Sequence, residues 1–233
     1  FKEIDLENIE IKKLPELEQF MLHKIYNLDL NFNKYFINYD FHNLYKELLN
    51  FCTVDLSAFY FDIRKDTLYC DPRDSKKRKS TLLLLNIILN SLLKWFAPIL
   101  SFTTEEIYQL VAQKKKSIHL ESFIIFPKKF ENLELNNKWI QLLKIRDFCN
   151  LSIEEKRANK EIGSSLEAAL TLKLSKKNLE ITKEIDLSEL CITSSVEIQS
   201  NDKEEIEVKT SKALGEKCPV CWKISQSSCS RHG

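Results

Sequence analysis

Apolar residues recur every three or four positions along the first two thirds of the chain, which is the spacing of one buried helix face. Between Pro15 and Leu30, for example, Leu17, Phe20 and Met21 fall on such a face. The pattern predicts five helices, at about residues 15–30, 40–61, 74–96, 103–111 and 137–161.

Two local signals mark helix ends. Thr103-Thr-Glu-Glu106 has the spacing of a capping box and predicts the start of the short fourth helix. Gly163 follows the fifth helical run, and glycine is the natural residue for a left-handed helix terminator.

The period changes from helix to strand after Gly163. Apolar side chains at Leu166, Leu170 and Leu174 belong to an alternating series, which is typical of a half-buried strand. Further strands are expected within residues 190–198 and at 206–208, with a helix at about 178–185 between the first two.

These elements predict a mainly α protein: an up-and-down helical bundle, then a small α+β unit, then a zinc knuckle at the C-terminus. The expected boundaries are 1–135 for the bundle, 136–163 for a long connecting helix packed on it, 164–214 for the α+β domain and 215–233 for the knuckle.

Composition narrows the class of protein. The 233 residues carry a net charge of +1, so nucleic-acid affinity would have to come from local patches. Only 3 residues are glycine, which argues against a Gly-lined nucleotide loop. Polar residues interrupt the most apolar stretch, 82–93, so we expect a buried helix there and no membrane association. The chain begins at Phe1 without a methionine and is expected to be a fragment of something larger.

The last sixteen residues hold the clearest chemical signal. Cys218, Cys221, Cys229 and His232 have the spacing C-x2-C-x7-C-x2-H, which suits a tetrahedral zinc ion. Four protein ligands leave no open position, so the ion would be structural. The alternative is a set of free or disulfide-bonded thiols. The other cysteines, Cys52, Cys70, Cys149 and Cys191, are scattered singly, as in a reduced cytosolic protein.

Basic residues cluster where the third helix is predicted to begin, and their density fits phosphate contacts. Composition alone favours a solvated helix start, but cations oppose the dipole at a helix N-terminus, which argues for a function. A second basic turn, at Arg157 and Lys160, has a favourable dipole and is explained equally well by structure. Trp222 would pack against the knuckle or offer a stacking face to a base. The candidate RNA-binding residues are Arg64, Lys65, Arg73, Lys76, Lys77, Arg78, Lys79, Arg157, Lys160 and Trp222.

No catalytic constellation stands out. His23, His42 and His119 have no partner cluster, and no Ser/His/Asp arrangement is visible. We therefore predict that this chain holds no catalytic residue.

Several segments resemble bacterial isoleucyl-tRNA synthetases, in the expected order. They are residues 39–42, 51–52, 56–69, 95–106, 117–121, 157–168 and 215–222, so the resemblance covers nearly the whole chain. The runs 59–69 and 163–168 favour the isoleucine enzyme over its valine and leucine relatives.

The resemblance implies the anticodon-binding part of a class I ligase that joins isoleucine to tRNA(Ile) with ATP. The parent enzyme would be cytoplasmic and monomeric. Its catalytic domain, which alone uses ATP, and its editing domain would lie before Phe1. This piece would grip the anticodon arm. A stand-alone zinc-dependent nucleic-acid-binding module is the alternative, as is the same region of the valine or leucine enzyme.

The C-terminal cluster departs from the family's usual pattern. That pattern has a longer spacer and ends in two cysteines, whereas here His232 stands in place of the fourth cysteine. Histidine is an acceptable zinc ligand, so coordination remains the expectation. A truncated finger with a further ligand downstream is the alternative.

Overall fold

Two stretches of sequence build each compact unit of this protein. Unit 1 takes Phe1–Tyr60 and Pro72–Leu133, and unit 2 takes Phe61–Asp71 and Glu134–Gly233. The computed structural model describes residues 5–112, 116–229 and 231–232. Within this described part, no helix has both the length and the apolar character that crossing a membrane requires.

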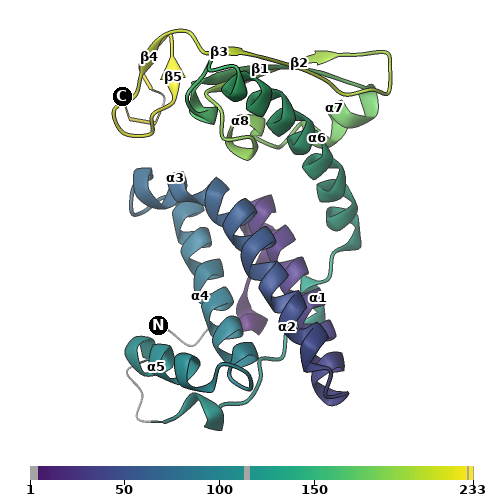
Figure 1. Ribbon diagram of the computed structural model, residues 1–233, viewed down its shortest axis with the longest axis vertical. Coiled ribbons are helices and arrows are strands. Elements are labelled where there is room, and N and C mark those ends of the chain that lie inside the picture. The colour runs from purple at the N-terminus through teal and green to yellow at the C-terminus, as the bar shows by residue number, and fades with distance from the viewer. Residues whose placement is uncertain (1–4, 113–115, 230, 233) are drawn as a thin grey trace. The chain divides into compact units, whose positions relative to one another are not determined.

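Unit 1 is a helical bundle. In Figure 1, α1 and α4 run alongside one another with α2 next to α1, and α5 lies across the end of α4. The helices are α1 (Glu16–Ile37), α2 (Phe41–Asn50), α4 (Lys76–Phe96) and α5 (Ser101–Ala112), with single 3-10 turns at Leu6–Asn8, Ile11–Lys13, Ile118–Leu120 and Lys128–Phe130.

The predicted third helix is confirmed as α4, because its N-terminal signal and its apolar stripe agree. Ser75 caps the helix by accepting from the backbone N–H of Arg78, and Leu84, Ile88 and Trp95 are buried along its length. The buried apolar face of α1 packs in the same core through Phe20, Met21, Leu22, Ile25, Leu28 and Phe32.

Buried polar groups on α1 have partners in the bundle. Glu18 accepts from the hydroxyls of Tyr60 (3.1 Å) and Thr81 (3.3 Å). Trp95 Nε1 donates to Asp29 Oδ1 over 3.2 Å. Satisfied groups of this kind cost little when buried and fix how the helices pack together.

The helix that was predicted to end near Phe61 continues to Cys70. A π-helical segment, Phe51–Phe61, follows α2 and leads directly into α3 (Asp62–Cys70). Ile63 and Thr67 of α3, which belongs to unit 2, are buried, and this burial stabilises a helix that its own polar sequence did not predict.

Unit 2 places helices against a small sheet. The long helix α6 (Leu133–Ala158) begins at the end of unit 1 and lies along one face of the sheet in Figure 1. Strands β1 (Ala168–Leu174), β2 (Ser195–Ser200) and β3 (Glu207–Lys212) have the order β2-β1-β3, with β1 parallel to β2 and antiparallel to β3. The remaining elements are a 3-10 turn at Ser165–Glu167, α7 (Lys176–Thr182), α8 (Leu187–Leu190), β4 (Glu216–Lys217) and β5 (Ile224–Ser225).

The alternating pattern is confirmed in β1, where Ala168, Leu170, Leu172 and Leu174 are buried. The prediction of a strand from residue 190 is wrong, because Asp186 caps the short helix α8 there, accepting from two backbone N–H groups. With a helical bundle followed by a small α+β unit, the predicted fold class is confirmed.

Two predicted helix signals act differently from expectation. Helix α5 begins at Ser101, so Thr103 and Glu106 lie inside it and do not form its start, while the neighbouring Glu105 carboxylate accepts from the backbone N–H of Ile118 and the hydroxyl of Ser117. The left-handed residue after α6 is Lys160, with φ of 59°, and not Gly163. Lys160 N–H bonds to the Arg157 carbonyl and Glu161 N–H to the Lys156 carbonyl, which closes a Schellman turn.

Candidate metal centre and nucleic-acid interface

A tight turn between β4 and β5 presents the first two cysteines of the C-terminal cluster. The backbone N–H of Cys218 bonds to the carbonyl of Lys223 (2.9 Å), and Trp222 N–H bonds back to Cys218 (3.0 Å). Gly215 precedes the turn with φ of 120°, and a Cβ there would lie 2.0 Å from the Ser225 carbonyl oxygen. Only glycine fits this position, so it permits the close approach of the two strands.

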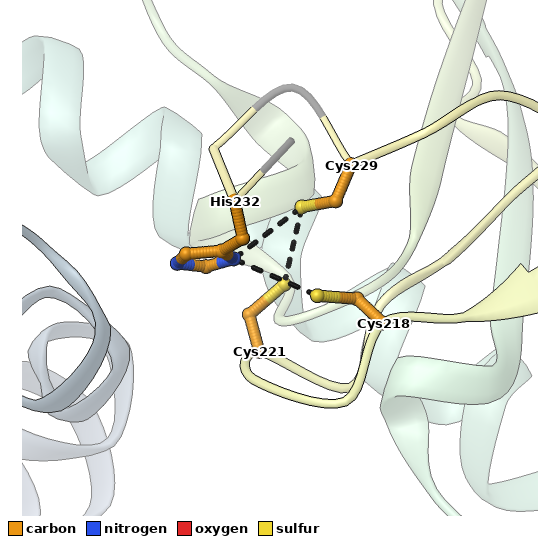
Figure 2. Close-up of side chains that lie close together, drawn as sticks. All are labelled: Cys218, Cys221, Cys229 and His232. Atoms are coloured by element: carbon orange, nitrogen blue, oxygen red, sulfur yellow. Dashed lines mark hydrogen bonds between the residues drawn. The ribbon is translucent and has the colours of Figure 1, made fainter.

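The four predicted metal ligands converge at one point (Figure 2). The ligand atoms of Cys218, Cys221, Cys229 and His232 all lie within 4.8 Å of one another. His232 Nδ1 is 3.6 Å from Cys218 Sγ and 3.4 Å from Cys229 Sγ, and the sulfurs of Cys221 and Cys229 are 3.7 Å apart. Ligands about 2.0–2.3 Å from a tetrahedral ion lie roughly 3.3–3.8 Å from each other, so the group fits a four-coordinate metal.

Backbone N–H groups lower the pKa of two of the four ligands, the thiols of Cys218 and Cys229. The N–H groups of Cys221 and Val220 lower the pKa of Cys218 to about 6, and the N–H of Arg231 lowers the pKa of Cys229. Burial raises the pKa of Cys221 to about 11. Because the thiolate is the metal-binding form, the two lowered pKa values favour ligation at neutral pH.

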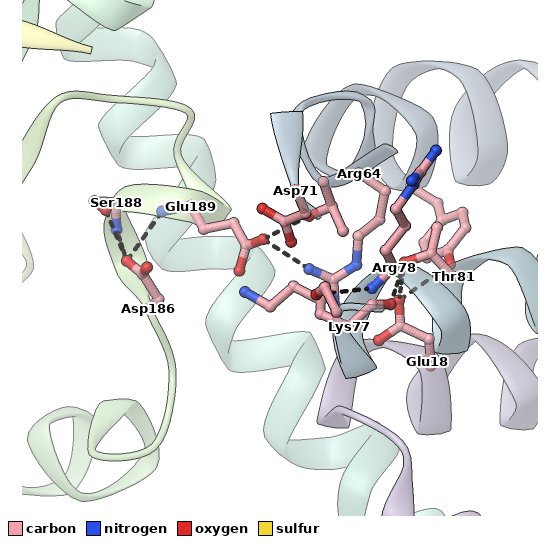
Figure 3. Close-up of polar contacts among 12 residues, drawn as sticks. Glu18, Arg64, Asp71, Lys77, Arg78, Thr81, Asp186, Ser188 and Glu189 are labelled. Carbon is pink, nitrogen blue, oxygen red and sulfur yellow. Dashed lines mark hydrogen bonds and ion pairs between the residues drawn. The ribbon is translucent and has the colours of Figure 1, made fainter. Parts of the chain in front are cut away.

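The first turn of α4 carries the densest positive charge. Lys76, Lys79 and the preceding Arg73 are exposed. Lys77 and Arg78 are half-buried, and Figure 3 shows both close to the buried pair Glu18 and Thr81. Three exposed cations therefore lie within residues 73–79, at and just before the start of α4, and give this segment the positive charge that an anionic partner requires.

Arg64 does not lie on the surface, contrary to what the candidate interface requires. Its side chain is 4% exposed, and Nη1 donates to Glu189 Oε1 over 2.8 Å within unit 2 (Figure 3). This ion pair between the buried Arg64 and the half-buried Glu189 holds α3 against α8, so we remove Arg64 from the interface. Its neighbour Lys65 is exposed and pairs with Asp62 (2.7 Å).

Arg157 and Lys160 lie at the end of α6 beside an open hollow that Lys212 also lines. Carboxylates share this surface: Arg157 pairs with Glu154 over 2.6 Å, and Glu161 and Glu167 line the hollow too. Opposite charges are thus interspersed here, which makes this a weaker anion site than the first turn of α4.

Trp222 is mostly exposed. Its side chain is 58% accessible with φ of 64°, and Lys217 Nζ lies 5.1 Å from the ring centroid. Of the two roles expected for Trp222, packing against the knuckle and offering a stacking face, this exposure favours the second. An exposed ring with a cation beside it is suited to a stacked, negatively charged ligand.

Reasoning from the sequence missed one group that contacts the metal cluster. The carbonyl oxygen of Cys70 lies 3.2 Å from His232 Nε2, across 162 residues of sequence. A backbone carbonyl carries no residue-type signal, so no pattern in the sequence pointed to it.

Comparison with known proteins agrees with this architecture. The family described as "Anticodon-binding domain of tRNA ligase" matches residues 18–174. Isoleucine–tRNA ligases are similar over almost the whole chain: that of Pelagibacter ubique is 63% identical over 100% of this chain, that of Brachyspira hyodysenteriae 41% over 93%, and that of Bartonella quintana 39% over 94%.

The similarity is confined to one part of those enzymes. This chain covers 26%, 24% and 24% of the three relatives, about a quarter of their length. The matched region, residues 18–174, includes α2, α4, α5 and all but the first two residues of α1, and it continues through β1. The chain therefore belongs to the family of anticodon-binding domains of tRNA ligases.

Proposed function

We propose that this chain is the anticodon-arm-binding portion of an isoleucine–tRNA ligase and that its partner is tRNA(Ile). The observation that carries the proposal is the similarity to isoleucine–tRNA ligases over at least 93% of the chain. Activation of isoleucine with ATP and its transfer belong to the remainder of such an enzyme, and we assign no catalytic residue here.

The proposed contact surface begins at the exposed cations of α4. Arg73, Lys76 and Lys79 would bind phosphates, with Lys65 and the α6 end (Arg157 and Lys160) contributing less because carboxylates neutralise them. Such contacts position a nucleic acid without reading its sequence. Binding energy gained here would raise the transfer rate by aligning the acceptor end with a distant active site.

We propose that the Cys218–His232 cluster holds one structural zinc ion. Three sulfurs and one imidazole nitrogen at tetrahedral spacing support zinc over harder cations, which prefer oxygen ligands. The ion would complete the fold of the finger and leave no position for substrate. We also propose that the parent enzyme is cytoplasmic and monomeric. The seven free cysteines agree with a reducing compartment.

Charge reversal tests the phosphate surface. In Arg73→Glu/Lys76→Glu/Lys79→Glu, acidic residues at the start of α4 agree with the helix dipole, so the bundle should stay folded. Filter binding should show the affinity for tRNA(Ile) falling at least tenfold. The slope of log affinity against log salt should fall by about 0.7–0.9 for each phosphate that the variant no longer neutralises.

The chain offers a matched control. Ser175-Lys-Lys at the start of α7 repeats the Ser75-Lys-Lys sequence at the start of α4, with the same serine cap, but without the additional cations. Lys176→Glu/Lys177→Glu should leave tRNA binding nearly unchanged. Equal affinity and equal salt slope in the wild type and the α4 variant would refute the surface, and tRNA(Val) bound as tightly as tRNA(Ile) would count against the isoleucine assignment.

A further inference from the structure

The finger contacts the end of α3 through three groups within unit 2. His232 Nε2 lies 3.2 Å from the carbonyl oxygen of Cys70, and the Cys70 thiol lies 3.7 Å from the carbonyl of Val220. Arg231, next to the last metal ligand, pairs with Asp71. The finger is therefore fastened to the C-terminus of this helix.

The chemistry of the imidazole ring fixes the direction of the first contact. Nδ1 faces the sulfurs of Cys218 and Cys229 (Figure 2), so a metal ion would take the lone pair of Nδ1. The proton of a neutral ring must then sit on Nε2, which becomes the donor to the Cys70 carbonyl. A metal-bound histidine commonly donates its second ring N–H to a backbone carbonyl in this way, and the contact orients the ring.

The acceptor is also a group that needs a partner. Cys70 is the last residue of α3, and the final four carbonyls of a helix lack intrahelical donors. These carbonyls form the negative end of the helix dipole, and a metal ion polarises the ring N–H that faces them. A bound metal would therefore strengthen this hydrogen bond, because it makes the ring N–H a better donor to a carbonyl that has no donor within its own helix.

We propose that His232, once it holds the metal through Nδ1, is the C-terminal cap of α3, so that metal binding and the ordering of α3 are coupled. This inference rests on the proposed zinc. His232 is then a positioning residue as well as a ligand. The cysteine that the family's usual pattern would have at position 232 could bind the ion equally well, but it has no second donor for the carbonyl.

His232→Cys separates the two roles, because it keeps a fourth ligand and removes the cap. The full chain is compared as wild type, His232→Cys and Cys218→Ser, by zinc content and by amide hydrogen exchange over residues 62–71. In zinc-loaded His232→Cys we expect zinc to be retained and exchange in α3 to be about fivefold faster, the effect of removing roughly one hydrogen bond. Cys218→Ser should lose the zinc and exchange at least as fast.

His119→Cys is the matched control. His119 Nε2 also lies near a backbone carbonyl, that of Ser101 at 3.3 Å, but it belongs to unit 1, whereas the metal cluster belongs to unit 2. This variant should change neither the zinc content nor the exchange of α3.

The outcomes distinguish the two proposals. Unchanged exchange of α3 in zinc-loaded His232→Cys would overturn the cap and leave the zinc site standing. A wild-type chain that takes up no zinc would overturn the zinc site, and the cap with it. The cap would be supported if zinc slowed the exchange of α3 in metal-free wild type and did not slow it in His232→Cys.

Discussion

Trp95 and Trp222 show how differently two regions of this molecule are held together. Trp95 in the bundle is 0% exposed, packs against Phe32 with ring centroids 5.9 Å apart, and donates its indole N–H to Asp29. Trp222 in the finger is 58% exposed and has Lys217 beside its ring. The bundle uses its tryptophan as core, whereas the finger leaves its tryptophan in solvent.

The difference extends to the surrounding residues. Among the described residues of the finger (215–229 and 231–232), the buried side chains are the ligands Cys218 and Cys221, while Val220 is 51% exposed and Ile224 is half-buried. So little buried apolar surface cannot offset the entropy of ordering a segment of this length, at roughly 1–2 kcal/mol for each residue. The comparison teaches that burial stabilises unit 1, whereas the finger would depend on the proposed metal ion for its stability.

Metal removal should produce the largest difference in stability between the finger and unit 1. A chelator would cost the finger an apparent 10 kcal/mol or more, on the order of the binding free energy of structural zinc. We expect trypsin to cut rapidly after Lys217 and Lys223 while the helices of unit 1 stay protected. Loss of bundle helicity at the same chelator concentration would contradict the comparison.

Truncation of the buried Trp95 should destabilise unit 1 and leave the finger unaffected. Trp95→Ala leaves a large cavity, and we expect unit 1 to lose about 3–5 kcal/mol of unfolding free energy. Chemical denaturation followed by circular dichroism measures the loss, and zinc content should remain that of the wild type. A loss below about 1 kcal/mol would mean that the core around Trp95 does not depend on it.

Asp29 makes the stability of the bundle depend on pH. Burial raises its pKa from 3.8 to about 6, and hydrogen bonds from Trp95 and Asn33 offset part of that increase. The folded state therefore keeps a proton that the unfolded state releases, so the contribution is largest below pH 4 and is lost as pH rises to about 6.

Asp29→Asn should remove this dependence. Asparagine keeps an oxygen acceptor for the Trp95 indole and cannot ionise. We expect the difference in unfolding free energy between variant and wild type to change by about 2–3 kcal/mol from pH 4 to pH 7, in favour of the variant at pH 7. Unfolding curves at several pH values test this, and a constant difference across that range would contradict it.

Trp222→Gly should have the smallest effect. The ring is mostly in solvent, and glycine relieves the positive φ of 64° at this position. The stability of the finger should change by less than about 1 kcal/mol, which the rate of zinc transfer to a chromophoric chelator would report. Trp222→Ala is the control that keeps the backbone strain. Weaker tRNA binding in both variants, with zinc retained, would identify Trp222 as a stacking face.

Features set by short stretches of sequence could be predicted. The helix α4 follows from a serine cap and a regular apolar stripe, and β1 follows from strict alternation. The metal cluster also follows from spacing, because each close ligand pair lies within a single turn. In each case the residues that determine the feature are a few positions apart.

Features that depend on residues far apart in the sequence could not be predicted. Arg64 looks like a surface cation until Glu189, 125 residues away, pairs with it. The helix α6 ends before Gly163 because Ile162 has to turn back into the core, so Lys160 takes the left-handed position. The Cys70 carbonyl has no signature at all. Each of these features depends on tertiary contacts, and the local pattern of a single sequence does not reveal which distant residues will make contact.

The placement of α3 in unit 2 has a consequence for the order of events during synthesis. Its partners in the finger are encoded 150 to 162 residues later. At a translation rate of about 5–20 residues per second, α3 leaves the ribosome roughly 8–30 s before Val220, Arg231 and His232 exist. Unit 1 closes long before that, because both of its stretches end by Leu133. The nascent chain therefore carries α3 without these three partners until Val220, Arg231 and His232 have been synthesised.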